Sequence, residues 1–215
     1  MNTRRVLPLL ALLLLAACRA GAEEQATPAL PAGFETVHLG MSVSELRAAH
    51  PSIRHDDFPY STLYFERLPA DHPSRFSDVG YMFDDKSGRL VQITFSWTGA
   101  KPELERRCGA FVASLESRLG VPEVRRIGVI RRHYITNATH EFPVMEWSRD
   151  DVVVTARCVA ISDAPKVRNF YDLTIATAAF AATRPAGELR ASDAAEQERL
   201  FAPLLSRRAD APEFR

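Results

Sequence analysis

The chain has six histidines, the side chains most often used as metal ligands and acid–base groups. None of them forms an H-E-x-x-H motif or an i, i+4 pair, the spacings that place two imidazoles on one helix face. The densest group is His50 and His55 with Asp56 and Asp57, which follows Pro51 in a polar stretch. This group could bind a metal weakly, and a solvated loop is the alternative. We expect a loop, with no metal site and no cofactor.

The sequence also lacks the common motifs of nucleophilic catalysis and phosphate binding. It has no G-x-S-x-G motif and no glycine-rich phosphate loop. A nucleophilic cysteine needs a neighbouring base and a free thiol, and Cys108 and Cys158 are expected to pair with each other. Four aspartates fall in predicted turns, where Asp is favoured for local backbone hydrogen bonds: Asp84, Asp85, Asp150 and Asp151. We therefore expect no catalytic residues and no enzyme activity.

A third cysteine, Cys18, ends an apolar leader. Two arginines, Arg4 and Arg5, precede the apolar run from Val6 to Ala17. This run of about a dozen residues is shorter than the roughly 20 that a membrane-spanning helix needs, so residues 1–17 are predicted to be a signal peptide. Leu15-Ala16-Ala17-Cys18 resembles the lipobox of bacterial lipoproteins. The resemblance implies that Cys18 is lipidated, becomes the first mature residue and anchors the protein in a membrane.

An ordinary secretory signal with an incidental cysteine is the alternative. Arg19 follows the cysteine where an inner-membrane retention signal would often have Asp. In a Gram-negative host this favours the outer membrane, facing the periplasm. Residues 18–33 are poor in large apolar side chains, which is typical of a flexible tether.

The charge balance argues against a nucleic-acid partner. The chain has 27 basic and 27 acidic residues, and loss of the leader with Arg4 and Arg5 leaves 25 basic residues, a net charge near −2. A protein that binds nucleic acid through phosphate contacts usually carries a strongly basic field. We expect no nucleic acid among the partners.

Apolar residues recur with two periodicities, one typical of strands and one typical of helices, and together they predict the fold. Period-two alternation predicts a β-hairpin over residues 79–97, with a turn at Asp84–Gly88. A helix is predicted over Lys101–Leu119, because apolar residues from Leu104 to Leu119 form one stripe and Gly120 and Pro122 end it. Further strands are expected at Ser61–Arg67, Ile127–Thr136, Phe142–Ser148, Val152–Ala160 and Tyr171–Thr177.

These elements predict an α+β domain over residues 34–181, with an antiparallel sheet and helices packed on one face. The order helix, strand, hairpin occurs twice, which suggests tandem helix-plus-β-meander units at about 34–100 and 101–181. Residues 182–215 are expected to form a C-terminal tail with a possible surface helix at Asp193–Arg207.

Both remaining cysteines are expected to point into the core, Cys108 from the apolar stripe of its helix and Cys158 from the inner face of its strand. A helix packed on that sheet would bring them together. In an exported chain we expect a Cys108–Cys158 disulfide, and two buried free thiols are the alternative. Closing a loop of about 50 residues is worth roughly 4 kcal/mol in the chain-entropy model.

The start of the domain carries a second resemblance. Ser42 and Glu45 fit a capping box at the start of a short helix, with Met41 and Leu46 placed for a hydrophobic staple. Leu39-Gly40-Met41-Ser42 followed by Glu45-Leu46 resembles the opening of small envelope lipoproteins of the SmpA/OmlA type and of β-lactamase-inhibitor-like modules. One SmpA/OmlA-type protein is an accessory subunit of the outer-membrane β-barrel assembly machine.

Two stretches are candidate binding surfaces. The first is a basic segment that could meet lipid phosphates or an acidic partner, or could be a charged edge strand protected against aggregation: Arg125, Arg126, Arg131 and Arg132. The second is an aromatic stretch that could form an exposed patch or be buried under its loop: Phe58, Tyr60, Tyr64 and Phe65.

The resulting hypothesis is a non-catalytic, lipid-anchored envelope protein that binds or scaffolds an envelope protein partner. Its role would lie in outer-membrane assembly or maintenance. The alternative is an inhibitor-like module that binds a periplasmic hydrolase.

Overall fold

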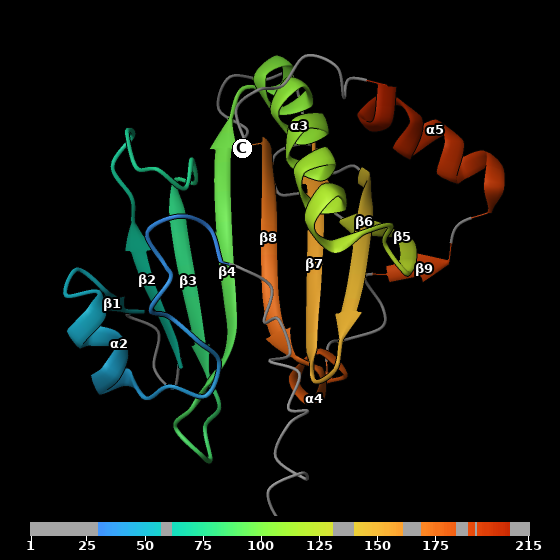
Figure 1. The fold of residues 1–215 in the computed structure, drawn as a ribbon. Helices are drawn as coiled ribbons and strands as arrows, with labels where there is room; N and C mark the ends of the chain where they lie inside the picture. Colours follow the sequence, from blue (N-terminus) through green and yellow to red (C-terminus); the bar gives the residue numbers. More distant parts are fainter. Residues whose placement is uncertain are drawn as a thin grey trace, which may run out of the picture.

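The alternating apolar residues form one large antiparallel sheet. The computed structural model describes residues 30–56, 62–130, 140–160, 169–183, 189–191 and 193–206. Within them nine strands lie in the order β1-β2-β3-β4-β8-β7-β6-β5-β9, and every neighbouring pair is antiparallel. Helices accompany the sheet, so the predicted α+β class with an antiparallel sheet is confirmed (Figure 1).

The first half of the domain, residues 34–99, starts with a short helix. Its elements are α2 (Val43–Ala49), β1 (Arg54–His55), β2 (Leu63–Arg67), β3 (Asp78–Phe83) and β4 (Leu90–Gly99). The second half, residues 101–177, consists of α3 (Lys101–Leu119), β5 (Val124–Ile130), β6 (His140–Arg149), β7 (Val152–Val159) and β8 (Asn169–Thr177). After it come α4 (Ala178–Ala181), β9 (Leu189–Ala191) and α5 (Ala194–Ser206).

The halves join through their last strands. Strand β4 pairs with β8 over eight residue pairs, among them Phe95 with Leu173 and Trp97 with Tyr171. Each half is a meander of four consecutive strands, so the β4–β8 pair lies in the middle of the sheet. The first and second halves thus build one sheet rather than two.

Helix α3 forms where the sequence predicted it and covers the centre of the sheet. Its stripe buries Leu104, Cys108, Phe111, Val112 and Leu115, and the helix contacts β4, β7 and β8. In Figure 1 it lies in front of β7 and β8. The Phe111 ring lies 4.9 Å from that of Tyr171 on β8, which continues the apolar contact into the sheet.

Interactions at the N-terminus of helix α2 stabilise it. The Ser42 hydroxyl accepts from the Glu45 amide, and the Glu45 carboxylate accepts from the Ser42 amide at 2.6 Å, so the predicted capping box is confirmed. Met41 is 4% and Leu46 0% exposed, as a hydrophobic staple requires. Leu46 belongs to the same core cluster as Leu104 of α3.

The predicted turn between β3 and β4 is also confirmed. The Asp84 carboxylate accepts from the amide and hydroxyl of Ser87, and the Gly88 amide donates to the Asp84 carbonyl. Gly88 has φ +64°, which a glycine adopts without the steric cost of a side chain. These bonds fix the hairpin that places β4 at the centre of the sheet.

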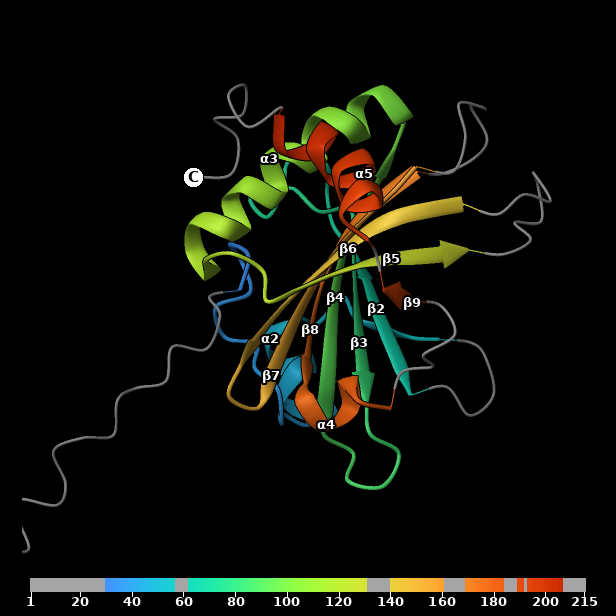
Figure 2. The same ribbon diagram turned by 90° about the vertical axis from the view of Figure 1, so that its right-hand side faces the viewer.

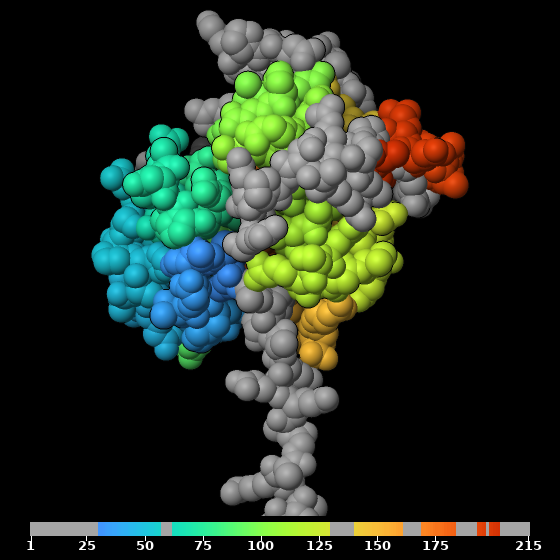
Figure 3. Space-filling view, turned by 45° about the horizontal axis from the view of Figure 1, so that its top comes forward, coloured from blue at the N-terminus to red at the C-terminus, as the bar shows by residue number. Residues whose placement is uncertain are grey.

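Several strand boundaries differ from the sequence prediction, and the tail contributes more to the fold than expected. Strand β5 begins at Val124 rather than Ile127, because its register with β6 pairs Val124 with Glu146. The stretch beyond Ala182 adds to the fold: β9 pairs with β5, and α5 packs against α3 with Phe201 only 2% exposed. Figure 2 shows α5 beside α3, and Figure 3 shows α5, in red, at the side of the molecule. The tail helix is therefore not only a surface element.

Candidate binding surface

The face of the sheet opposite α3 carries a row of polar side chains across its central strands. Side chains alternate along a strand, so the residues between the buried Phe95, Trp97, Tyr171 and Leu173 point to this other face. We call these residues the polar face: Gln92, Thr94, Ser96, Thr155, Arg157, Asp172 and Thr174.

Threonines form the middle of the polar face. The register places Thr94 of β4 and Thr155 of β7 on either side of Thr174 of β8. The Thr94 and Thr174 hydroxyl oxygens lie 3.3 Å apart, and the Gln92 amide donates to the Thr94 hydroxyl at 3.2 Å. Thr155 and Thr174 are 2% and 4% exposed, whereas Gln92, Thr94 and Ser96 are partly exposed. The surface is therefore hydrogen-bonded within itself, and the side chains of β4 are its partly exposed part.

An ion pair between β7 and β8 supplies the two charged side chains of the polar face. Arg157 donates from Nε to Asp172 Oδ1 at 2.9 Å and from Nη2 to Oδ2 at 2.6 Å, a bidentate geometry. The Asp172 side chain is 3% exposed and that of Arg157 is 36% exposed. The guanidinium thus neutralises a buried carboxylate and keeps part of its own surface in solvent.

A small apolar cluster lies beside this pair on the same face. Phe142, Val144 and Val159 are buried there, and the partly buried Phe170 packs on them. A side chain at Gly128, on β5, would overlap the Phe142 ring, so this glycine makes room for it. The face opposite α3 therefore combines polar and apolar areas.

The basic segment of the sequence does not form one patch. Arg125 and Arg126 are neighbours on β5, so their side chains leave opposite faces of the sheet. Arg125 lies 3.6 Å from Glu116 of α3 and over the Phe201 ring of α5, and Arg126 lies 3.4 Å from Glu146. The edge-strand alternative is wrong for residues 126–128, where β9 pairs with β5.

The aromatic stretch is divided in the same way. Tyr64 packs edge-on against His55 and Phe83, and the Arg47 guanidinium of α2 lies over its ring, which makes it part of the first half's packing. Phe65 points to the other face and is 42% exposed. The other residues proposed for these surfaces lie outside the described residues, as does Cys18: Phe58, Tyr60, Arg131 and Arg132.

The structure brings Cys108 and Cys158 to disulfide distance. Their Cα atoms are 6.2 Å apart, within the usual range for a disulfide, and the pair joins α3 to β7 across 50 residues. Cys108 is 1% and Cys158 6% exposed. This is the placement that the helix stripe and the strand alternation predicted.

His50 belongs to a network inside the first half. Its Nδ1 lies 3.0 Å from Glu66 Oε2, Ser52 donates to the other carboxylate oxygen, and the Tyr81 hydroxyl donates to Oε2 at 3.3 Å. The His50 ring also stacks on Phe34 at 4.9 Å, and burial raises the pKa of Tyr81. In the described part of the chain no three His, Cys, Asp or Glu side chains are close enough to hold a metal. Asp57, which the sequence grouped with His50, lies outside that part.

Sequence reasoning missed the Arg157–Asp172 pair. The signal that could have found it is a single charged residue at an outward position of each of two otherwise uncharged strands, Arg157 in β7 and Asp172 in β8. Only the pairing of the two strands shows that they face each other.

Comparison with other proteins does not assign the chain to a family. No family model, no curated protein and no solved structure matches the chain. Among the described helices, none combines the length and the apolar character needed to cross a membrane.

Proposed function

We propose that this protein is a lipid-anchored envelope lipoprotein that acts without catalysis, by binding a protein partner through the polar face. The observation that carries the proposal is the Arg157–Asp172 pair within a row of threonines, on the sheet face opposite α3. A surface of this kind offers a partner hydrogen bonds and the exposed part of a fixed guanidinium whose charge Asp172 balances, which favours specific recognition.

Anchoring rests on the sequence. The leader ends in a lipobox-like pattern at Cys18, and more than one acyl chain on this cysteine would hold the protein firmly. With Arg19 after the cysteine, we place the protein in the outer membrane of a Gram-negative host, facing the periplasm. A role in outer-membrane assembly or maintenance follows from the SmpA/OmlA resemblance alone.

The finer architecture also belongs to the proposal. We infer two tandem units, each a helix followed by a four-stranded meander, with both helices on one face of the shared sheet. Support comes from the strand order, in which the two meanders meet at their last strands, and from the common core cluster that holds Leu46 of α2 and Leu104 of α3.

The test is cross-linking of the tagged, lipidated protein in intact cells, followed by identification of what it captures. The decisive variant is Ser96→Arg, which places a bulky cation beside Asp172 on the polar face. Its matched control is Ser117→Arg, the same change at an exposed position on α3. We expect wild type and Ser117→Arg to capture one recurrent envelope protein and Ser96→Arg to lose it. Equal capture by Ser96→Arg would contradict the proposed surface.

The same experiment separates the alternative function. A soluble hydrolase in place of an envelope protein would favour the inhibitor-like module. The anchor is tested apart from the partner: Cys18→Ser should abolish incorporation of labelled palmitate and release the protein from the membrane fraction. Retention of label in Cys18→Ser would contradict lipidation at this cysteine.

A further inference from the structure

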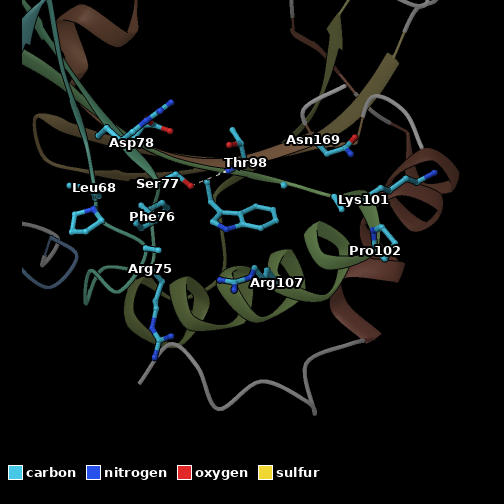
Figure 4. Close-up of a pocket in the computed structure, with 16 residues that line it drawn as sticks. Leu68, Arg75, Phe76, Ser77, Asp78, Thr98, Lys101, Pro102, Arg107 and Asn169 are labelled. Atoms are coloured by element: carbon cyan, nitrogen blue, oxygen red, sulfur yellow. Dashed lines mark hydrogen bonds and ion pairs between the residues drawn. The ribbon is translucent and has the colours of Figure 1, made fainter. Parts of the chain in front are cut away.

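A pocket of about 890 Å³ opens at one end of the sheet, away from the centre of the polar face. Its walls come from the segment between β2 and β3, from the end of β4 and the start of α3, and from Asn169 at the start of β8 (Figure 4). The volume lies in the range of small-molecule sites. The pocket is therefore large enough for an organic ligand rather than a single ion.

The lining is strongly basic in a chain whose overall charge is zero. Arg67, Arg75, Lys101 and Arg107 line the pocket against one acidic residue, Asp78, which gives a formal charge of +3. Asp78 lies 3.4 Å from Arg67, and Glu103 beside the pocket pairs with Arg107 at 2.8 Å, so the formal charge is +2 when both carboxylates are counted. Cations gathered in one concave site attract anions.

Arg107 is held in position before any ligand arrives. Its guanidinium lies 5.1 Å from the centre of the Trp97 ring, and its Nε donates to Glu103 at 2.8 Å. Trp97 in turn stacks on Tyr171 at 5.3 Å. Gly99 permits this arrangement, because a side chain there would overlap the indole. A fixed guanidinium loses little side-chain entropy when it binds a ligand.

Two of the cations occupy positions that local folding preferences disfavour. Arg75 has φ +62°, a left-handed conformation that is uncommon for a residue with a Cβ. Lys101 is the first residue of α3, where the helix dipole favours an acidic side chain over a cation. Both side chains nevertheless line the pocket.

We propose that this pocket binds a phosphate monoester that carries an apolar group. The guanidinium and ammonium groups suit a dianionic phosphate, for which Arg offers bidentate hydrogen bonds. Leu68, Pro69 and Pro102 line the same pocket and provide contact for the apolar group. This site is separate from the protein-binding role proposed above and does not depend on it.

Calorimetry with the full chain in phosphatidylcholine vesicles tests the proposal with three probes. Phenyl phosphate should bind at least tenfold more tightly than inorganic phosphate, because only phenyl phosphate uses the apolar wall. No binding of phenyl phosphate, or equal affinity for the two, would overturn the proposal. Monomeric dihexanoylphosphatidate distinguishes the source: tighter binding than phenyl phosphate indicates a lipid headgroup, and weaker binding a water-soluble monoester.

Variants separate binding from folding. Arg75→Gly should weaken the binding of phenyl phosphate at least tenfold. The melting temperature should stay the same or rise, because glycine adopts the positive φ without strain. Asp150→Gly is the matched control, because Asp150 is the other described non-glycine residue with positive φ and lies in the β6–β7 turn. It should leave binding unchanged.

The second variant pair tests the start of α3. Lys101→Gln should weaken binding with no loss of stability, and Lys86→Gln, in the β3–β4 turn, should change neither. Wild-type affinity in both Arg75→Gly and Lys101→Gln would overturn the assignment even if the wild type binds phenyl phosphate.

Discussion

The first and second halves of the domain build the same meander but support it differently. In the second half a 19-residue helix covers the sheet, whereas in the first half a seven-residue helix is joined by the irregular segment that buries Phe34, Val37 and Met41. Helix α3 also contacts β4 of the first half. One long helix thus packs on strands of both halves, and no comparable helix belongs to the described part of the first half.

The halves also differ in what fixes their turns and helix ends. All three described carboxyl groups with a lowered pKa lie in the first half: Glu35, Glu45 and Asp84. In each, hydrogen bonds from nearby backbone amides, and for Glu45 and Asp84 from a serine hydroxyl, hold the pKa below its usual value. The second half instead has the Cys108–Cys158 pair and the long apolar stripe of α3. Acid and reductant should therefore act on different halves.

The largest expected effect concerns the cysteine pair in the second half. Replacing both Cys108 and Cys158 by alanine should lower the free energy of unfolding by about 4 kcal/mol, the chain-entropy value for a loop of this length. Urea denaturation with and without reductant measures it. Reductant should destabilise wild type and leave the double variant unchanged. If alkylation and mass measurement find two free thiols in the native protein, the disulfide is refuted. The second half would then lack the covalent link that distinguishes it from the first.

The two helices offer the next comparison. Leu104→Ala in α3 should cost about 3–5 kcal/mol and Leu46→Ala in α2 about 2–3 kcal/mol, both by leaving a cavity in the core. The costs differ because α3 packs on strands of both halves, although the two leucines are almost equally buried, at 2% and 0% exposure. Denaturant midpoints of the two variants check the order. If Leu46→Ala lowers the free energy of unfolding more than Leu104→Ala does, the expected order of the two helices is wrong.

A smaller effect is expected at the capping box of α2. Ser42→Ala removes the hydroxyl that accepts from the Glu45 amide and should cost about 1 kcal/mol. Ser117→Ala, at an exposed position on α3, is the matched control and should stay within about 0.5 kcal/mol of wild type. Thermal melts of both variants suffice. Equal effects would mean that the cap does not support the first half.

The smallest effect is the pH response. The folded pKa of Glu45 and Asp84 is lowered, so their contribution is present above the unfolded pKa and is lost as the pH falls through the folded value. Amide hydrogen exchange should show the first half losing protection before the second as the pH drops below about 4. Glu45→Gln should weaken this difference near α2. If both halves lose amide protection at the same pH, the proposed difference in acid sensitivity between them is wrong.

Local structure could be predicted from the sequence because its causes are local. The alternation around Phe95, the stripe around Leu104 and the capping serine Ser42 each act within a few residues, and the elements form where expected. Placement of Cys108 near Cys158 required one further assumption, that the helix lies on the sheet. These features needed no knowledge of which strands pair.

The binding surfaces needed that knowledge. Arg157 meets Asp172 only because β7 pairs with β8, and Arg125 meets Phe201 through a contact between segments distant in sequence. The basic pocket gathers Arg75, Lys101 and Arg107 from a loop and a helix with no shared motif. Sequence spacing cannot report such a juxtaposition. The surface expected around Arg125 was divided for a local reason, because Arg125 and Arg126 are neighbours on one strand and point to opposite faces.

The central pairing of β4 with β8 has a consequence for biosynthesis. Residues 100–168 separate the two strands, so β4 is complete on the emerging chain long before its partner exists. During that interval its hydrogen-bonding edge, with Phe95 and Trp97 beside it, has no native neighbour and is open to non-native strand pairing. The nascent protein is therefore most dependent on a holding chaperone after Gly99 has emerged and before Asn169 follows.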